Sequence, residues 1–241
     1  MKKTARLLTL AVALFAGFGG TAQAADFKIG ADVVSSYVWR GGELGNSPAI
    51  QPAISYTCPK TGLIIGAWGS YGISDNTEGT LAKYRYQEVD LYATIPAGPF
   101  SFTITDYYVV PEPNIGSSSR TFDFSSDGPN VVEASVAYAK DNLSLLAAIN
   151  IAGNKGDNKN GVKNAKYLEA GYKVYDKEGY TAKAFVGAGD QDYYGSKYLV
   201  QKNNTISIVN AGITVAKDRY TASYIYNPDT EKSNLVFMAS F

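Results

Sequence analysis

The last seven residues of the chain, Leu235-Val236-Phe237-Met238-Ala239-Ser240-Phe241, decide its fold. Successive side chains of a strand point to opposite faces. The side chains that share one face here are Leu235, Phe237, Ala239 and Phe241. A soluble domain rarely ends on an exposed apolar strand, because its unpaired edge is open to other chains. The segment therefore favours a β-barrel, in which closure removes the edge.

The start of the chain has the three-part pattern of an export signal. Its parts are a basic start (Lys2, Lys3, Arg6), an apolar stretch over residues 7–18 and the small-x-small sequence Ala22-Gln23-Ala24. The apolar stretch is shorter than the roughly 20 residues that a spanning helix needs. We expect residues 1–24 to be a cleaved signal peptide and residues 25–241 to form a single barrel domain.

The two ends of the chain together predict a location. A terminal strand that ends in an aromatic residue looks like the signal read by the machinery that assembles outer-membrane proteins. With an export signal at the other end, this strand predicts the outer membrane of a Gram-negative bacterium. The expected partners are outer-membrane lipid and lipopolysaccharide, the barrel-assembly machinery and periplasmic chaperones.

The composition excludes several classes of function. The chain has 22 Lys and Arg, 22 Asp and Glu, no His and one Cys. Loss of the signal and its three basic residues leaves 22 − 3 = 19 basic against 22 acidic residues, a net charge of −3. This charge gives no broad cationic field, so no nucleic-acid partner is expected. Without His the commonest general base and metal ligand is missing, and one Cys cannot form a disulfide. We expect no enzyme, no metal and no cofactor.

Polar connections of two lengths divide the mature chain, and the two lengths alternate. The long ones are residues 41–47, 73–82, 111–129, 153–165, 190–203 and 227–231, and the short ones are 58–61, 96–98, 140–142, 176–179 and 217–219. This pattern gives twelve strands with both chain ends on the short-turn side. Outer-membrane barrels have an even number of antiparallel strands, tight periplasmic turns and longer outside loops. We predict an all-β fold, a single antiparallel transmembrane barrel of about 12 strands with both termini periplasmic.

Apolar and polar residues alternate within the segments with the period of a strand. In residues 87–95, for example, Val89 and Leu91 oppose Glu88 and Asp90. Charges in the middle of strands fit a lipid-facing exterior around a hydrated lumen. Aromatic residues near both strand ends predict two interfacial girdles. The loop-side girdle would contain Tyr37, Trp39, Tyr71, Tyr84, Tyr107, Tyr167, Tyr224 and Tyr226.

Three stretches near the start of the mature chain resemble a known family. They are Ser36-Tyr37-Val38-Trp39-Arg40-Gly41, Ser47-Pro48-Ala49-Ile50-Gln51 and Gly62-Leu63-Ile64-Ile65-Gly66-Ala67-Trp68-Gly69-Ser70. They are similar to motifs of the TorF-like porins, outer-membrane proteins of proteobacteria. The motif positions are Tyr37, Trp39, Arg40, Gly41, Pro48, Gln51, Trp68 and Ser70. The chain departs from the family at Ser36, Trp39 and Gly66-Ala67. The resemblance covers about the first three strands and implies an outer-membrane barrel and a porin.

Nine ionisable residues are candidates for the wall of the lumen: Asp32, Arg40, Arg85, Glu88, Asp90, Glu133, Glu169, Lys173 and Lys183. They would form either a mixed-charge constriction that filters polar solutes or a network that plugs the barrel. Strand number leaves both open, because about eight strands give a filled barrel and about sixteen an aqueous channel. Residues 111–129, the longest connection, are expected to fold inward as a constriction.

These features predict a porin-like channel for passive diffusion of small polar solutes through a narrow, mixed-charge lumen. One alternative is a closed barrel that serves as a structural or loop-displaying protein. Another is a secreted soluble β-protein. Acidic residues in the loops, such as Asp190 and Asp192, are oxygen ligands of the kind that bind calcium. None follows the EF-hand spacing, so we interpret them as solvated loop residues.

Overall fold

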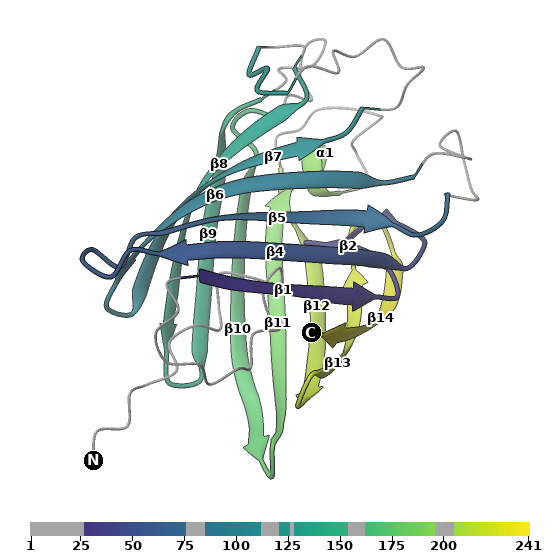
Figure 1. Cartoon of the computed structure of the whole chain (residues 1–241). Helices are drawn as coiled ribbons and strands as arrows, with labels where there is room; N and C mark the ends of the chain where they lie inside the picture. Colours follow the sequence, from purple (N-terminus) through teal and green to yellow (C-terminus); the bar gives the residue numbers. More distant parts are fainter. Residues whose placement is uncertain (1–26, 76–84, 112–120, 126–127, 154–161, 196–204) are drawn as a thin grey trace.

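A computed structural model describes residues 27–75, 85–111, 121–125, 128–153, 162–195 and 205–241 of the chain. Twelve strands form one closed antiparallel barrel (Figure 1). They are β1 (Phe27–Val34), β4 (Ala49–Thr57), β5 (Ile64–Gly72), β6 (Gln87–Ala97), β7 (Phe100–Val109), β8 (Asn130–Lys140), β9 (Leu143–Ala152), β10 (Lys166–Lys177), β11 (Tyr180–Asp190), β12 (Ile206–Lys217), β13 (Tyr220–Asn227) and β14 (Lys232–Ser240). The prediction of an all-β, twelve-stranded antiparallel barrel is confirmed. The predicted signal peptide, residues 1–24, lies outside the described residues.

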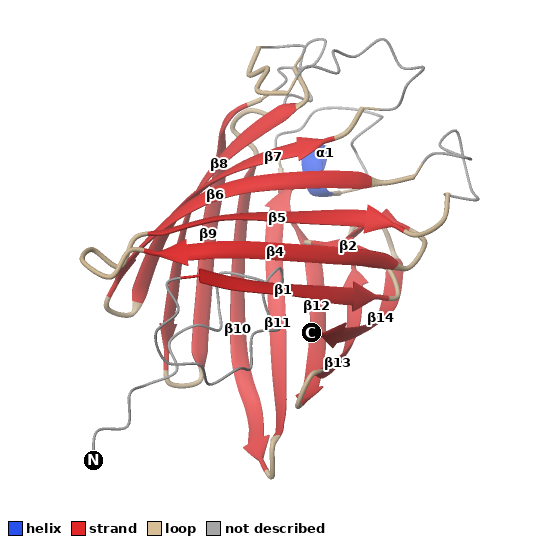
Figure 2. Ribbon diagram, in the orientation of Figure 1, coloured by secondary structure: helices blue, strands red, loops and turns tan. Residues whose placement is uncertain are grey.

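Among the described residues, three further elements are not part of the barrel wall. Strands β2 (Tyr37–Trp39) and β3 (Gly42–Gly45) form a separate two-stranded ribbon between β1 and β4. The short helix α1 (Gln191–Tyr194) follows β11, and strands make up almost all of the remaining regular structure (Figure 2). Within the described part of the chain, no helix has the length and apolar character needed to cross a membrane.

Pairing of the first strand with the last closes the barrel. Ala31 N–H donates to the carbonyl oxygen of Phe241 (3.1 Å), and Phe241 N–H donates to the carbonyl oxygen of Ala31 (2.9 Å). At the other end of this pairing, Ser35 N–H donates to the carbonyl oxygen of Phe237 (2.9 Å). Between the two ends, Asp32, Val33 and Val34 lie opposite Ser240, Ala239 and Met238. The C-terminal residue is therefore part of the seam. Strand β1 begins, and β14 ends, at the short-turn end of the barrel.

The barrel has apolar side chains on its outer face and polar side chains on its inner face, the reverse of a soluble barrel. Large apolar side chains face outward and are exposed, among them Ile29, Ile54, Leu91, Ile104, Leu145, Leu168, Val186, Ile213, Leu235 and Phe237. Buried polar side chains line the inside, among them Gln51, Ser70, Glu88, Asp90, Thr94, Glu133, Ser144, Asn150 and Asn210. A barrel with an apolar exterior and a polar interior is compatible with an outer-membrane protein.

The aromatic residues form only part of the predicted girdles. At the short-turn end, Phe27 packs on Tyr56 (ring centroids 4.9 Å apart) and Phe100 on Tyr138 (5.0 Å). At the loop end the prediction was wrong for Tyr37, Tyr107 and Tyr167, which are buried, and for Trp39, which packs against Tyr107. These rings face the lumen, where buried charged side chains give them polar partners. Tyr84 lies outside the described residues.

The first strand is shorter than the sequence suggests. We expected it to extend to Arg40, but β1 ends at Val34 and the chain then turns into the barrel as the β2–β3 hairpin. The expected constriction, residues 111–129, has residues 112–120 and 126–127 outside the described part. The connection from β1 to β4 enters the lumen.

Replacement of Phe241 by Ala should lower the amount of folded barrel recovered from expressing cells several-fold, because the residue directly follows β14 and its backbone bonds form part of the seam. Phe122→Ala is a matched control, since Phe122 is similarly exposed (62% against 67%) but lies outside the strands. Heat-dependent migration in gels measures the folded fraction. Equal folded fractions for both variants and the wild type would contradict the role given to the terminal strand.

Candidate functional site

The β2–β3 hairpin places a glycine where only a glycine fits. Its tip, Arg40-Gly41, has positive φ at both residues (49° and 83°). A Cβ atom on Gly41 would lie 1.9 Å from the carbonyl oxygen of Val209 on β12. Asn227 on β13 donates from Nδ2 to the carbonyl oxygen of Gly41 (3.4 Å). The tip is therefore packed against β12 and β13 of the wall.

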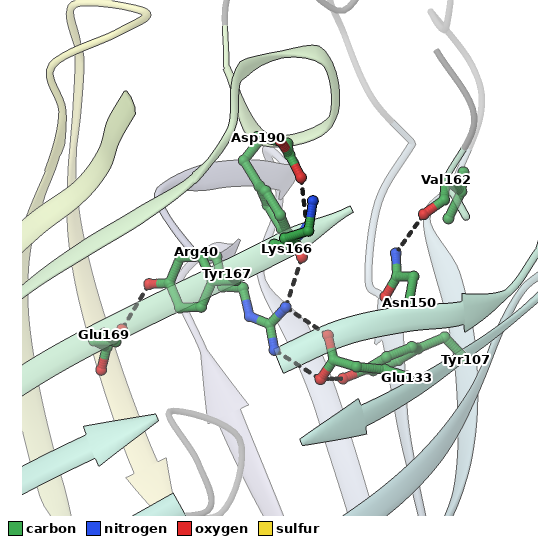
Figure 3. A network of polar contacts seen from close by, with 10 residues as sticks. Arg40, Tyr107, Glu133, Asn150, Val162, Lys166, Tyr167, Glu169 and Asp190 are labelled. Carbon is green, nitrogen blue, oxygen red and sulfur yellow. Dashed lines mark hydrogen bonds and ion pairs between the residues drawn. The ribbon is translucent and has the colours of Figure 1, made fainter. Parts of the chain in front are cut away.

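Arg40 forms an ion pair across the lumen (Figure 3). Its Nη1 and Nη2 donate to Oε2 and Oε1 of Glu133 on β8, at 2.6 and 2.8 Å. The two side chains are only 9% and 3% exposed. Tyr107 on β7 donates its hydroxyl to the same carboxylate (3.2 Å). Because two parallel N–H···O bonds fix both distance and angle, this pair holds the hairpin in one position.

Aromatic rings surround the Arg40 guanidinium. Its central carbon lies 4.5 Å from the ring centroids of Trp39 and Tyr167 and 5.6 Å from that of Tyr194. Such cation–π contacts strengthen when they are shielded from water. Burial raises the pKa of Tyr194 to about 12, so its phenol is protonated at neutral pH. Its oxygen accepts a hydrogen bond from Arg40 Nη1 (2.7 Å).

A second polar group continues from Tyr167 along β10 to β12. The Tyr167 hydroxyl donates to Oε2 of Glu169 (2.7 Å). Asn210 Nδ2 donates to the Tyr167 hydroxyl oxygen (2.8 Å) and to Oε2 of Glu169 (3.1 Å). Lys183 on β11 lies 3.9 Å from the other carboxylate oxygen of Glu169. Glu169 and Glu133 are therefore each paired with one cation of the chain.

A third group lies on β5 and β6, beside the hairpin. Tyr37 of β2 packs against Trp68 (5.4 Å between centroids) and Tyr86 (5.7 Å). The Tyr86 hydroxyl donates to Oε2 of Glu88 (3.0 Å). Asp90 lies opposite Trp68 in the β5–β6 ladder. Both carboxylates are buried, at 5% and 2% exposure.

Two other predicted lumen residues, Asp32 and Lys173, have different surroundings. Asp32 lies opposite Gln51 and Ser240, which are both buried. Lys173 lies directly opposite Lys183 and pairs with Asp176.

Arg85 requires a correction. It lies on the rim with Tyr71 and Asp75, both exposed, and not in the lumen. The alternation of side chains along a strand explains this. Glu88 and Asp90 face inward, so residue 85, an odd number of positions away from each, faces the other side of the sheet.

The positions on which the sequence resemblance to the porin-like family rests gather around the hairpin. Tyr37, Trp39, Arg40 and Gly41 belong to it. Gln51 Nε2 donates to Ser70 Oγ next to Trp68 (3.2 Å), and the carbonyl oxygen of Pro48 accepts from Ile73 N–H (2.7 Å). The motif residues therefore build one structural unit at the loop end.

Sequence reasoning missed residues that hold the hairpin: Tyr107, Tyr167, Tyr194, Asn210 and Asn227. Each lies on a strand or helix far along the chain from Arg40, and the available signal was an aromatic or amide side chain near the loop end of a strand. Among the described residues, no group of three or more His, Cys, Asp or Glu could hold a metal ion.

These features define the protein's class: a closed twelve-stranded β-barrel whose loop end is crossed by an inward hairpin. The chain belongs to the Gcw_chp family, a bacterial protein family of unknown function, whose family model matches residues 19–236. No curated protein matches the chain.

Replacement of Arg40 by Ala should destabilise the barrel by about 3–5 kcal/mol, because it leaves the Glu133 carboxylate buried without its cation. The double variant Arg40→Ala/Glu133→Gln should recover much of this loss. Urea unfolding of the refolded protein in lipid vesicles measures both. Arg85→Ala, on the exposed rim, is the control and should change stability far less. An equal loss of stability in Arg40→Ala and Arg85→Ala would contradict the structural role of the Arg40–Glu133 pair.

Gly41→Ala should loosen the hairpin, because the added methyl group meets the Val209 carbonyl and the left-handed backbone costs about 1–2 kcal/mol. Gly98→Ala is the matched control, since Gly98 also has positive φ (62°) but nothing lies within 4 Å of its Cβ position. Limited proteolysis within residues 37–45 reports the loosening. Gly98→Ala should leave cleavage within residues 37–45 at the wild-type rate, and a wild-type rate in Gly41→Ala as well would contradict the packing of the tip against Val209.

Proposed function

We propose that this protein is an outer-membrane channel for small polar solutes, narrowed at its loop end by the β2–β3 hairpin. The observation that carries the proposal is the difference between the two ends of the lumen. Aromatic and charged side chains fill the loop end around Arg40. Toward the short turns, the inner wall has hydroxyl side chains, such as the hydrogen-bonded pairs Thr94–Thr103 (2.8 Å) and Thr214–Ser223 (2.9 Å), with Lys183 directly opposite Thr214.

The constriction has the properties of a solute filter. Charged side chains of both signs, held by fixed hydrogen bonds, select solutes by orientation and charge. The hairpin supplies the cation Arg40, and the wall supplies Glu88, Asp90 and Glu133. In this proposal the short turns and both termini face the periplasm, and the long connections face outward.

A second candidate function follows from the length of the hairpin. Its tip reaches the wall opposite β1, because β8 and β10 lie across the ring from β1 and β4. If this contact never opens, the protein is a closed structural barrel that displays its loops. The porin proposal and this alternative differ in conductance.

Single-channel conductance in a planar bilayer tests the proposal. Because Val34 lies directly opposite Ala49 in the β1–β4 ladder, removal of residues 37–45 leaves residues 35–36 and 46–48 to join the two strands as a short loop. We expect small steps from the wild type and larger steps from this deletion variant. Glu88→Lys should shift selectivity toward anions. A folded deletion variant that never conducts would overturn the channel and leave the closed barrel.

A further inference from the structure

Carboxylates meet aromatic rings at two places in the lumen. At the first, Glu133 and the rings of Trp39 and Tyr167 hold the Arg40 guanidinium. This place shows which ligand chemistry the lumen can hold: a cation whose N–H groups bond a carboxylate while its faces lie on aromatic rings. The chain provides the cation itself.

At the second place the described residues provide carboxylates and rings but no cation. Glu88 and Asp90 lie two residues apart on the inner face of β6, beside Tyr37, Trp68 and Tyr86. No ion pair found among the described residues includes either carboxylate. Within the part of the chain that the structure describes, the two buried acids therefore lie next to one another without a cationic partner.

An atom at this place also lacks a hydrogen-bond donor. Oδ1 of Asp90 is buried and has no hydrogen-bond partner among the residues that the structure describes, and the whole residue is 2% exposed. A buried acceptor without a donor costs roughly 1–3 kcal/mol, and two neighbouring carboxylates add repulsion. A ligand that carries both a positive charge and N–H donors removes both costs.

We propose that Glu88 and Asp90 bind the ammonium or guanidinium group of a small organic cation. A metal ion fits less well, because calcium needs about six to eight oxygen ligands and two carboxylates with neighbouring phenols provide fewer. No third acidic residue joins them into a metal-binding group within the described ranges. The neighbouring rings favour an organic cation. The inference deepens the proposed channel function by naming its solute class, and its test does not depend on conductance.

The two tryptophans of the chain, Trp39 and Trp68, both lie in the lumen and provide the measurement. We would titrate the refolded protein with methylammonium chloride at constant ionic strength, with sodium chloride as the balancing salt, and follow tryptophan fluorescence. A saturable change is expected in the wild type. Glu88→Gln/Asp90→Asn should weaken the apparent affinity at least about tenfold, which is about 1.4 kcal/mol. Asp90→Asn alone is the second variant should the double variant fail to fold.

Asp75→Asn, which removes an exposed rim carboxylate, is the matched control and should respond as the wild type does. Tetramethylammonium, which has no N–H, should bind more weakly than methylammonium. An equal response to calcium or sodium, or an unchanged response in folded Asp90→Asn, would overturn the proposal. Binding without conductance would retain this site and overturn only the channel, whereas conductance without binding would do the reverse.

Discussion

The backbone pairing of β1 with β14 is the interaction on which the rest of the structure depends. Without this pairing, which includes the reciprocal bonds between Ala31 and Phe241, both strands would be open edges and the wall would not be closed. Closure gives every strand two neighbours, which is the only arrangement that lets a sheet present an apolar face to hydrocarbon. It also converts one face of the sheet into an interior. The polar residues on that face must then find partners inside the barrel.

At the loop end, other side chains of the protein are the partners of the buried polar residues. Glu133 is buried on β8, and a buried carboxylate is stabilised only by a cation with good geometry and further hydrogen bonds. The β2–β3 hairpin brings Arg40 to it, and Tyr107 donates the additional bond. Near the short turns, pairs of hydroxyl groups satisfy one another across strands. The loop end is therefore filled by charged and aromatic side chains, whereas the short-turn end is lined by hydroxyl side chains and by Lys183.

Sequence reasoning predicted what local patterns determine. Strand number follows from the alternation of long and short connections, and the outward face of Leu235 and Phe237 follows from period-two alternation. The hairpin was not predictable in this way. An aromatic residue at a strand end, such as Tyr37 or Tyr107, has the same local pattern whether its ring faces lipid or lumen. The Arg40–Glu133 pair joins residues separated by 93 positions, and no local pattern encodes such a contact.

The contacts of the hairpin tip also affect the order of folding. Arg40 meets Tyr194, 154 positions later, and Gly41 meets Asn227, 186 positions later. Contacts between residues so far apart in sequence are slow to form, because the intervening chain must be ordered first. Although the hairpin is synthesised directly after the first strand, its full set of partners exists only once β13 is in place. A chain interrupted before β13 can make part of these contacts but cannot complete them. The Arg40-Gly41 tip thus links the stability of the earliest segment to the completion of the last ones.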